Sequence, residues 1–135
     1  MRSQAAKQGD RIVGTDVHIV LVPAPPGNPV ATPLPHPFSG EIDSNTSPDV
    51  MIDGQPAATV GSVASNNPPH VPTSPGTEFQ TPPANRGRIT AGSGTVTIND
   101  RAAARHGDAA DTCDDAGARP LSSMVVVAAS TVEIG

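Results

Sequence analysis

Proline and glycine are spread along the whole chain and restrict its fold more than any other feature. The sequence holds 16 proline and 13 glycine residues. Neither residue suits a helix interior, because proline lacks the amide donor and glycine loses the most backbone entropy on ordering. Valine, which is β-branched and favours strands, outnumbers leucine 14 to 3. The sequence therefore predicts an all-β fold of short strands and rigid, proline-rich loops, with no long helix.

Large apolar side chains are too few for an ordinary hydrophobic core. Val, Ile, Leu and Phe together number 26, and the chain has no Trp or Tyr. Because each large side chain contributes about 1.5–3 kcal/mol when buried, we expect a thin core that needs a further stabilising device. Cys113 is the only cysteine, so that device is not an internal disulfide. Disorder is the alternative for such a composition, and evenly spaced hairpin signals argue against it.

An internal repeat organises the chain. Residues 50–61 and 96–107 both read Val-x-Ile-x-x-x-(Pro/Ala)-Ala-Ala-x-x-Gly, at an offset of 46 residues. A partial copy, residues 5–10, opens the chain, and residues 132–135 repeat the Val-x-Ile start. Such self-similarity is typical of structural units that stack on one another.

Each complete copy has the pattern of a β-hairpin. Val-x-Ile places two β-branched side chains on one face of a strand. Asp53-Gly54 and, more weakly, Asn99-Asp100 favour two-residue turns with positive φ. The alanines that follow begin the predicted return strand, which ends at Gly61 or Gly107. A hairpin of this size cannot bury its own face, so we predict that the copies pack together around one axis.

Residues that can bind a metal follow this repeat. His18 and His70 each lie nine residues after the glycine that ends a copy, and Cys113 lies six residues after the third such glycine. His36 lies in another proline-framed segment, which we expect to be a rigid loop. Three imidazoles and one thiolate form a four-ligand set that suits tetrahedral Zn²⁺. Zinc binding would stabilise the fold, by about 10–16 kcal/mol in zinc-finger peptides.

Other interpretations of these residues remain open. Each histidine alone is compatible with a surface loop, and Cys113 with a small buried apolar residue. His106 lies inside a predicted return strand, where we expect it to face solvent, with a role beside the metal ligands as the alternative. Within the acidic segment at positions 108–115, Asp111, Asp114 and Asp115 surround Cys113, and we expect them to raise its thiol pKa, the wrong direction for a nucleophile.

That acidic segment lacks the ligand alternation of a calcium loop and is predicted to be a solvated turn. A zinc hydrolase, in turn, would need an open coordination position, which four protein ligands do not leave. We therefore predict that the chain is not an enzyme.

Charge and hydropathy exclude several partners. The formal net charge is −5, the basic residues are scattered, and no aromatic platform is present, so nucleic acid is not expected. The N-terminus has no apolar stretch behind a basic one, and no apolar run approaches the length of a membrane span. We expect synthesis in the cytoplasm, no signal peptide and no stable membrane insertion. The longest apolar run, Met124–Ala129, is predicted to be one buried strand.

Together these segments resemble the PAAR repeat, named for Pro-Ala-Ala-Arg. The copies here read Pro56-Ala-Ala-Thr59 and Ala102-Ala-Ala-Arg105. The surrounding pattern resembles the PAAR-like subgroup of contractile injection systems, and consists of Asp16-Val-His18, Pro33–Gly40, Pro56–Ser62, Pro68-Pro-His70 and Gly107–Cys113. The resemblance is strongest over residues 5–113, within a single domain predicted over residues 1–135.

The resemblance implies a small cone of β-hairpins with approximate internal threefold repetition. It implies a zinc-pinned apex whose ligands are His18, His36, His70 and Cys113. The broad base is expected to bind a trimeric spike protein of the valine-glycine-repeat type, one copy per trimer.

The expected function is a structural tip. The resemblance implies that it caps and sharpens the spike of a type VI secretion-like or phage-tail-like machine, helps to pierce the target membrane and is ejected with the spike. The alternative is an adaptor that presents effector cargo at the spike tip. Because few residues lie outside the resemblance, we expect a bare tip rather than a fusion to a toxin.

Overall fold

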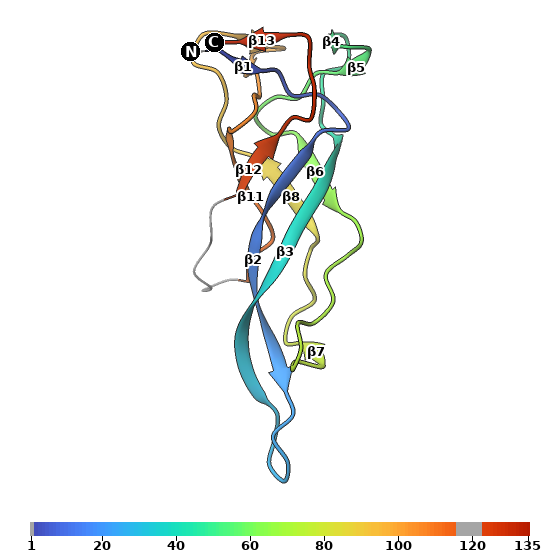
Figure 1. Cartoon of the computed structure of the whole chain (residues 1–135), viewed down its shortest axis with the longest axis vertical. Helices are drawn as coiled ribbons and strands as arrows, with labels where there is room; N and C mark the ends of the chain where they lie inside the picture. The colour runs from blue at the N-terminus through green and yellow to red at the C-terminus, as the bar shows by residue number, and fades with distance from the viewer. Residues whose placement is uncertain (1, 116–122) are drawn as a thin grey trace.

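The computed structural model describes residues 2–115 and 123–135, and within them every regular element is a β-strand (Figure 1). The strands are β1 Ser3–Gln4, β2 Arg11–Val22, β3 Val30–Ser44, β4 Met51–Ile52, β5 Gln55–Pro56, β6 Val63–Asn66, β7 Glu78–Phe79, β8 Arg86–Ile89, β9 Thr97–Ile98, β10 Arg101–Ala102, β11 Ala109–Asp111, β12 Ser123–Val126 and β13 Glu133–Ile134. The predicted all-β fold is confirmed. None of the described segments is a helix that could cross a membrane.

Six strands close into an antiparallel barrel in the middle of the molecule. Their order is β2-β3-β6-β8-β11-β12, and β12 pairs back onto β2. The barrel is made of three strand pairs, β2–β3, β6–β8 and β11–β12, and each pair begins just after one of the repeat glycines. The short β7 joins β2 outside the barrel, toward the narrow end of the molecule (Figure 1).

The alanine segments of the three copies form a ring of backbone hydrogen bonds next to the barrel. The amide of Ala6 donates to the carbonyl of Ala104 at 2.9 Å, Ala58 donates to Ala6 at 3.0 Å, and Ala104 donates to Ala58 at 3.0 Å. This cycle relates the three copies by an approximate threefold axis. The predicted threefold repetition is therefore confirmed.

The glycine that ends each copy makes the same turn. Gly9, Gly61 and Gly107 have φ values of 97°, 96° and 88°. Glycine adopts this left-handed conformation without the steric cost that other residues bear. Each glycine amide donates to a buried apolar residue on the returning strand of its pair: Ile42, Ile89 or Val125.

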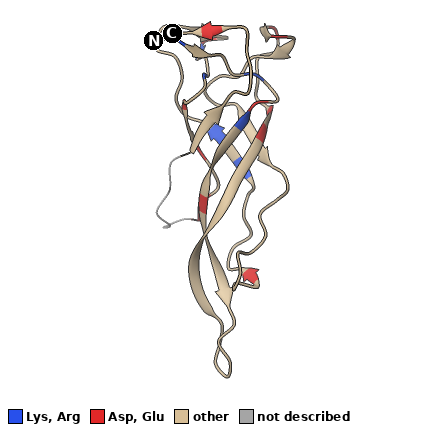
Figure 2. Ribbon diagram, viewed as in Figure 1, with Lys and Arg blue, Asp and Glu red and all other residues tan. Residues whose placement is uncertain are grey.

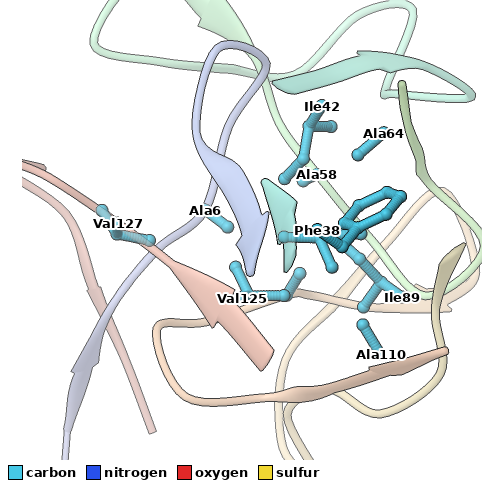
Figure 3. Close-up of a cluster of buried hydrophobic side chains, with 11 residues drawn as sticks. Ala6, Phe38, Ile42, Ala58, Ala64, Ile89, Ala110, Val125 and Val127 are labelled. Carbon is cyan, nitrogen blue, oxygen red and sulfur yellow. The ribbon is translucent and has the colours of Figure 1, made fainter. Parts of the chain in front are cut away.

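Small side chains let the ring pack on both of its faces. The second alanines of the copies belong to the barrel core, which Figure 3 shows and which comprises Ala6, Ile12, Phe38, Ile42, Ala58, Ala64, Ile89, Ala104, Ala110, Val125 and Val127. The first alanines face the broad end and pack with the isoleucines of the Val-x-Ile patterns, in a cluster of Ala5, Ile52, Ala57, Ile98, Ala103 and Ile134. The ring thus separates two thin hydrophobic layers.

Three two-stranded sheets form the broad end: β4–β5, β9–β10 and β1–β13. The first two are hairpins with positive φ at both turn residues, as predicted from Asp53-Gly54 and Asn99-Asp100. The third joins the two ends of the chain, and its register of Ser3 opposite Ile134 matches that of Gln55 opposite Ile52. The C-terminal fragment therefore completes the partial first copy.

The return strands are shorter than predicted. β5 and β10 contain two residues each. Beyond them the alanines leave their own hairpin and form single bridges to a neighbouring copy, Lys7 with Ala57 and Thr59 with Ala103. The prediction of one continuous return strand was wrong because the ring competes for the same backbone groups.

Two strands are much longer than predicted. β2 has 12 residues and β3 has 15, and they pair without interruption from Arg11 with Glu41 to Val22 with Val30. His36 therefore lies in a strand rather than in the predicted loop. The predicted buried strand at Met124–Ala129 was also wrong: β12 ends at Val126, and Met124 is 44% exposed because one face of the barrel strand points outward.

Candidate metal centre

Four potential ligands converge where the chain leaves the barrel toward the narrow end. Asp16 and His18 lie on β2, His70 follows β6, and Cys113 follows β11. One ligand atom from each lies within 4.8 Å of the others. Asp16 and His18 share a face of β2 because strand side chains alternate, and both are fully buried. Each of the three strand pairs of the barrel thus contributes to one cluster.

His36 borders this cluster from β3. It lies directly opposite Asp16 in the β2–β3 register. Its ring centroid is 5.3 Å from that of His18 and 5.6 Å from that of His70, and the latter two centroids are 5.0 Å apart. The structure therefore brings the three predicted histidines into mutual contact, with Cys113 3.6 Å from the Nε2 of His18.

The hydrogen bonds of His36 define its tautomer. Its Nδ1 donates to the carbonyl of Leu34 at 2.9 Å, which leaves the lone pair on Nε2. That Nε2 accepts the amide of Thr73 at 3.1 Å. Burial lowers the pKa of His36, so the neutral form that a metal ligand requires is favoured.

Asp16 is the hydrogen-bond acceptor at the centre of the cluster. Its Oδ2 accepts from Nε2 of His70 at 2.8 Å and from the thiol of Cys113 at 3.2 Å. Its Oδ1 accepts from the hydroxyl of Thr112. The sequence interpretation did not assign Asp16 to the site. Its position two residues before His18, on the same strand face, is the signal that could have identified it.

Asp114 and Asp115 support the cluster from the side. Asp115 accepts from Nδ1 of His18 at 2.9 Å, which leaves the lone pair on Nε2 of His18. A carboxylate in this position fixes the orientation and the tautomer of metal-binding histidines. Each of the two carboxylates also accepts a backbone amide of β2 at 2.7 Å, and burial raises the pKa of Asp114. The predicted solvated acidic turn was therefore wrong for these two residues.

The surroundings of Cys113 do not favour a nucleophilic thiolate. Burial, the hydrogen bond to Asp16 and the charge of Asp16 raise the pKa of its thiol to about 12. The predicted direction is confirmed, although Asp16 on β2 acts in place of the flanking acidic residues. Because the thiolate is the nucleophilic form, a raised pKa makes this thiol a poor nucleophile at neutral pH.

His106 lies outside the cluster. It is exposed, as predicted, but it occupies a turn rather than a strand. Its Nδ1 accepts the amide of Val127 at 3.0 Å.

The donor set fits zinc. Imidazole nitrogen, thiolate and carboxylate oxygen are the ligands that Zn²⁺ binds in proteins. Phe79 closes the narrow side of the cluster, with its ring centroid 5.7 Å from that of His18 and 5.3 Å from that of His36. Asp16 and His18 are fully buried, and His70 and Cys113 are partly buried. Enclosed donor sets of this kind are typical of structural zinc sites.

Comparison with known families is consistent with this geometry. The family model described as "PAAR motif" matches residues 34–116, more than half of the chain. The matched range includes His36, His70 and Cys113, whereas His18 and the first copy precede it. No curated protein and no solved structure matches the chain.

Proposed function

The chain belongs to the PAAR-motif family, and from that premise we propose that it caps and sharpens the trimeric spike of a contractile injection machine and helps to pierce the target membrane. Membership of the family implies a spike-tip protein of type VI secretion or a related contractile system, and the family is structural rather than catalytic.

The alanine ring is the observation that carries the proposal. Its cyclic hydrogen bonds make one chain approximately threefold symmetric, and the three two-stranded sheets of the broad end follow the same symmetry. A monomer of this form can meet a true trimer through three near-equivalent contacts, which avoids a symmetry mismatch.

The broad end also has a surface that a partner would cover. Met51 is 60% exposed, and Val50 and Val132 are each exposed by more than a third. Met51 lies in β4, and Val50 and Val132 directly precede β4 and β13, which are short strands of two-stranded sheets. Exposed strand edges and apolar side chains favour association, so docking on a spike would stabilise this end.

Co-purification with the cognate spike protein, followed by native mass spectrometry, tests the proposal. We expect one copy of this chain per spike trimer. Met51→Glu should weaken binding, whereas Val71→Glu, at a side chain that is 74% exposed outside the broad end, should not. Three copies per trimer, or no complex at any concentration, would contradict the proposal.

We further propose that the site holds one structural zinc through His18, His36, His70 and Cys113. Support comes from the contact of the three rings, from the tautomers of His18 and His36, and from the partly buried thiol of Cys113 beside them. When bound, the ion would link the three strand pairs of the barrel at one point. Elemental analysis of the purified chain should give about one zinc per molecule, and His36→Ala should reduce it.

A further inference from the structure

Beyond the candidate metal centre, the β2–β3 hairpin continues as a narrow finger, which we define as residues 19–35. Its strands pair from Ile19 with Pro33 to Val22 with Val30. In Figure 1 its turn is the narrow extremity of the molecule, at the end opposite to both termini. The outermost structure at the narrow end is therefore a hairpin, and the histidines lie at the base of this hairpin.

The finger carries no charge. Residues 19–35 contain no ionisable side chain, and their only polar side chains are those of Asn28 and Thr32. Figure 2 shows the narrow extremity free of charged residues. Val30 is 54% exposed, and the prolines around the turn are exposed as well. The nearest carboxylate along the sheet is Glu78, opposite Leu21, which marks where the uncharged surface ends.

The backbone of the finger also presents few free amide donors. Pro33 and Pro35 on β3 have no amide hydrogen. The carbonyl of Pro35 accepts from the hydroxyl of Thr73, outside the β2–β3 pair, so the proline nitrogen faces the open edge as well. On β2, the outward carbonyls of Ile19 and Leu21 accept the amides of Gln80 and Thr77. Both edges are thus poorly suited to pairing with other strands.

We propose that the end of the finger, residues 22–30, inserts into the boundary between headgroups and hydrocarbon of a lipid bilayer. The inference rests on the proposed function, in which the narrow end leads. Each charged group that enters a membrane adds a cost, and this segment contains none. The finger has no lysine or arginine to attract anionic headgroups, so neutral lipid suffices. The contact is shallow and reversible, and it ends where Glu78 meets the headgroups.

A single introduced tryptophan tests the insertion, because the chain has none of its own. Val30→Trp places the probe in the finger, and Met51→Trp places it at a similarly exposed position at the broad end. Each variant is titrated with vesicles of neutral phosphatidylcholine, with and without brominated acyl chains. Circular dichroism and zinc content establish that both variants are folded.

We expect a blue shift and bromine quenching for Val30→Trp and no change for Met51→Trp. Asn28→Asp in the Val30→Trp protein should reduce the shift, whereas Asn67→Asp, which adds the same charge in another loop, should not. An unchanged spectrum for folded Val30→Trp at saturating lipid, or equal responses at both ends, would overturn the inference. Binding to the spike is measured separately, so loss of that binding with intact lipid insertion would refute the proposed function alone.

Discussion

The broad end of the molecule repeats itself three times, whereas the narrow end does so only in part. At the broad end the same backbone hydrogen bonds recur in each copy, and small alanines occupy equivalent positions. Toward the narrow end the three strand pairs diverge: β2–β3 extends into the finger, and His70 follows β6 in a loop. Symmetry is retained where a trimeric partner is proposed to bind and is lost where single ligands surround a single site.

The two ends also differ in what holds them together. The broad end relies on backbone bonds and on a thin layer of alanine and isoleucine. The cluster at the base of the finger relies on side chains of buried polar residues, with Asp16 as the shared acceptor. A backbone ring tolerates many sequences of small residues, whereas the cluster depends on the identity of each member.

Removal of a metal ligand should give the largest effect and should act on the narrow end. Cys113→Ser should abolish most zinc binding. It should lower Tm by on the order of 10 °C, since about 1 kcal/mol corresponds to roughly 2–8 °C for domains of this size. Elemental analysis and calorimetry measure both quantities. His106→Ala, at the exposed turn, is the control and should keep the full zinc content. Full zinc occupancy in Cys113→Ser would show that the ligand set is wrong.

Overpacking of the ring should give the next effect, at the broad end. Ala57 is fully buried in the alanine and isoleucine layer of the broad end, and Ala57→Leu should reduce the free energy of unfolding by about 1–3 kcal/mol. Urea unfolding of the zinc-loaded protein measures this change. Ala31→Leu adds the same side chain at an exposed position in the finger and should be nearly neutral. If the two variants are equally stable, tight packing of the ring is not what the broad end depends on.

The repeat was predictable from the sequence because it depends on local chemistry. Positive φ at Asp53-Gly54 and at the repeat glycines follows from residue type alone. Residues 132–135 match the other Val-x-Ile starts, which indicated a further copy of the repeat. The pairing of the two chain ends that completes this copy was not predicted. The consecutive alanines predicted that neighbouring copies pack closely. Whether these alanines extend a hairpin or form a ring depends on tertiary contacts, which the sequence pattern does not encode.

The cluster was predictable only in part. The spacing from the repeat glycines identified His18, His70 and Cys113 as candidate ligands, because equivalent strands leave the barrel at the same end. The length of β3 was missed, since prolines suggest loops. The strand β3 tolerates Pro33 and Pro35 because their nitrogens face the edge of β3 that is not paired with β2. Asp16 and Asp115 were missed because a single carboxylate in a polar segment is ordinarily a surface residue.

Asp16 offers a finer test of the narrow end. Asp16→Asn keeps the shape of the side chain and removes its charge beside Cys113 and His70. Zinc affinity should fall by about 10–100-fold, the usual effect of removing a residue that orients metal ligands. Competition with a chromophoric chelator measures the affinity. Asp111→Asn, on the exposed face of β11, is the control, and equal affinities for the two variants would remove Asp16 from the site.

The smallest expected effect concerns the link that closes the broad end. Asp53, in the turn of β4–β5, accepts the amide of Thr131 at 2.8 Å and also its hydroxyl, and these bonds lower the pKa of the carboxyl below its ordinary value of 3.8. A carboxyl whose pKa is lower in the folded state stabilises that state above the unfolded pKa and loses this contribution as pH falls through the folded pKa.

Asp53→Asn should therefore be slightly less stable than the natural chain at pH 7, and the difference should shrink below pH about 4. Because Asp53 is exposed, solvent screening keeps the effect small. Thermal unfolding of both proteins from pH 7 to pH 2.5 measures it, with Asp100→Asn in the turn of β9–β10 as the control. A difference that grows as the pH falls would contradict the assigned role of this contact.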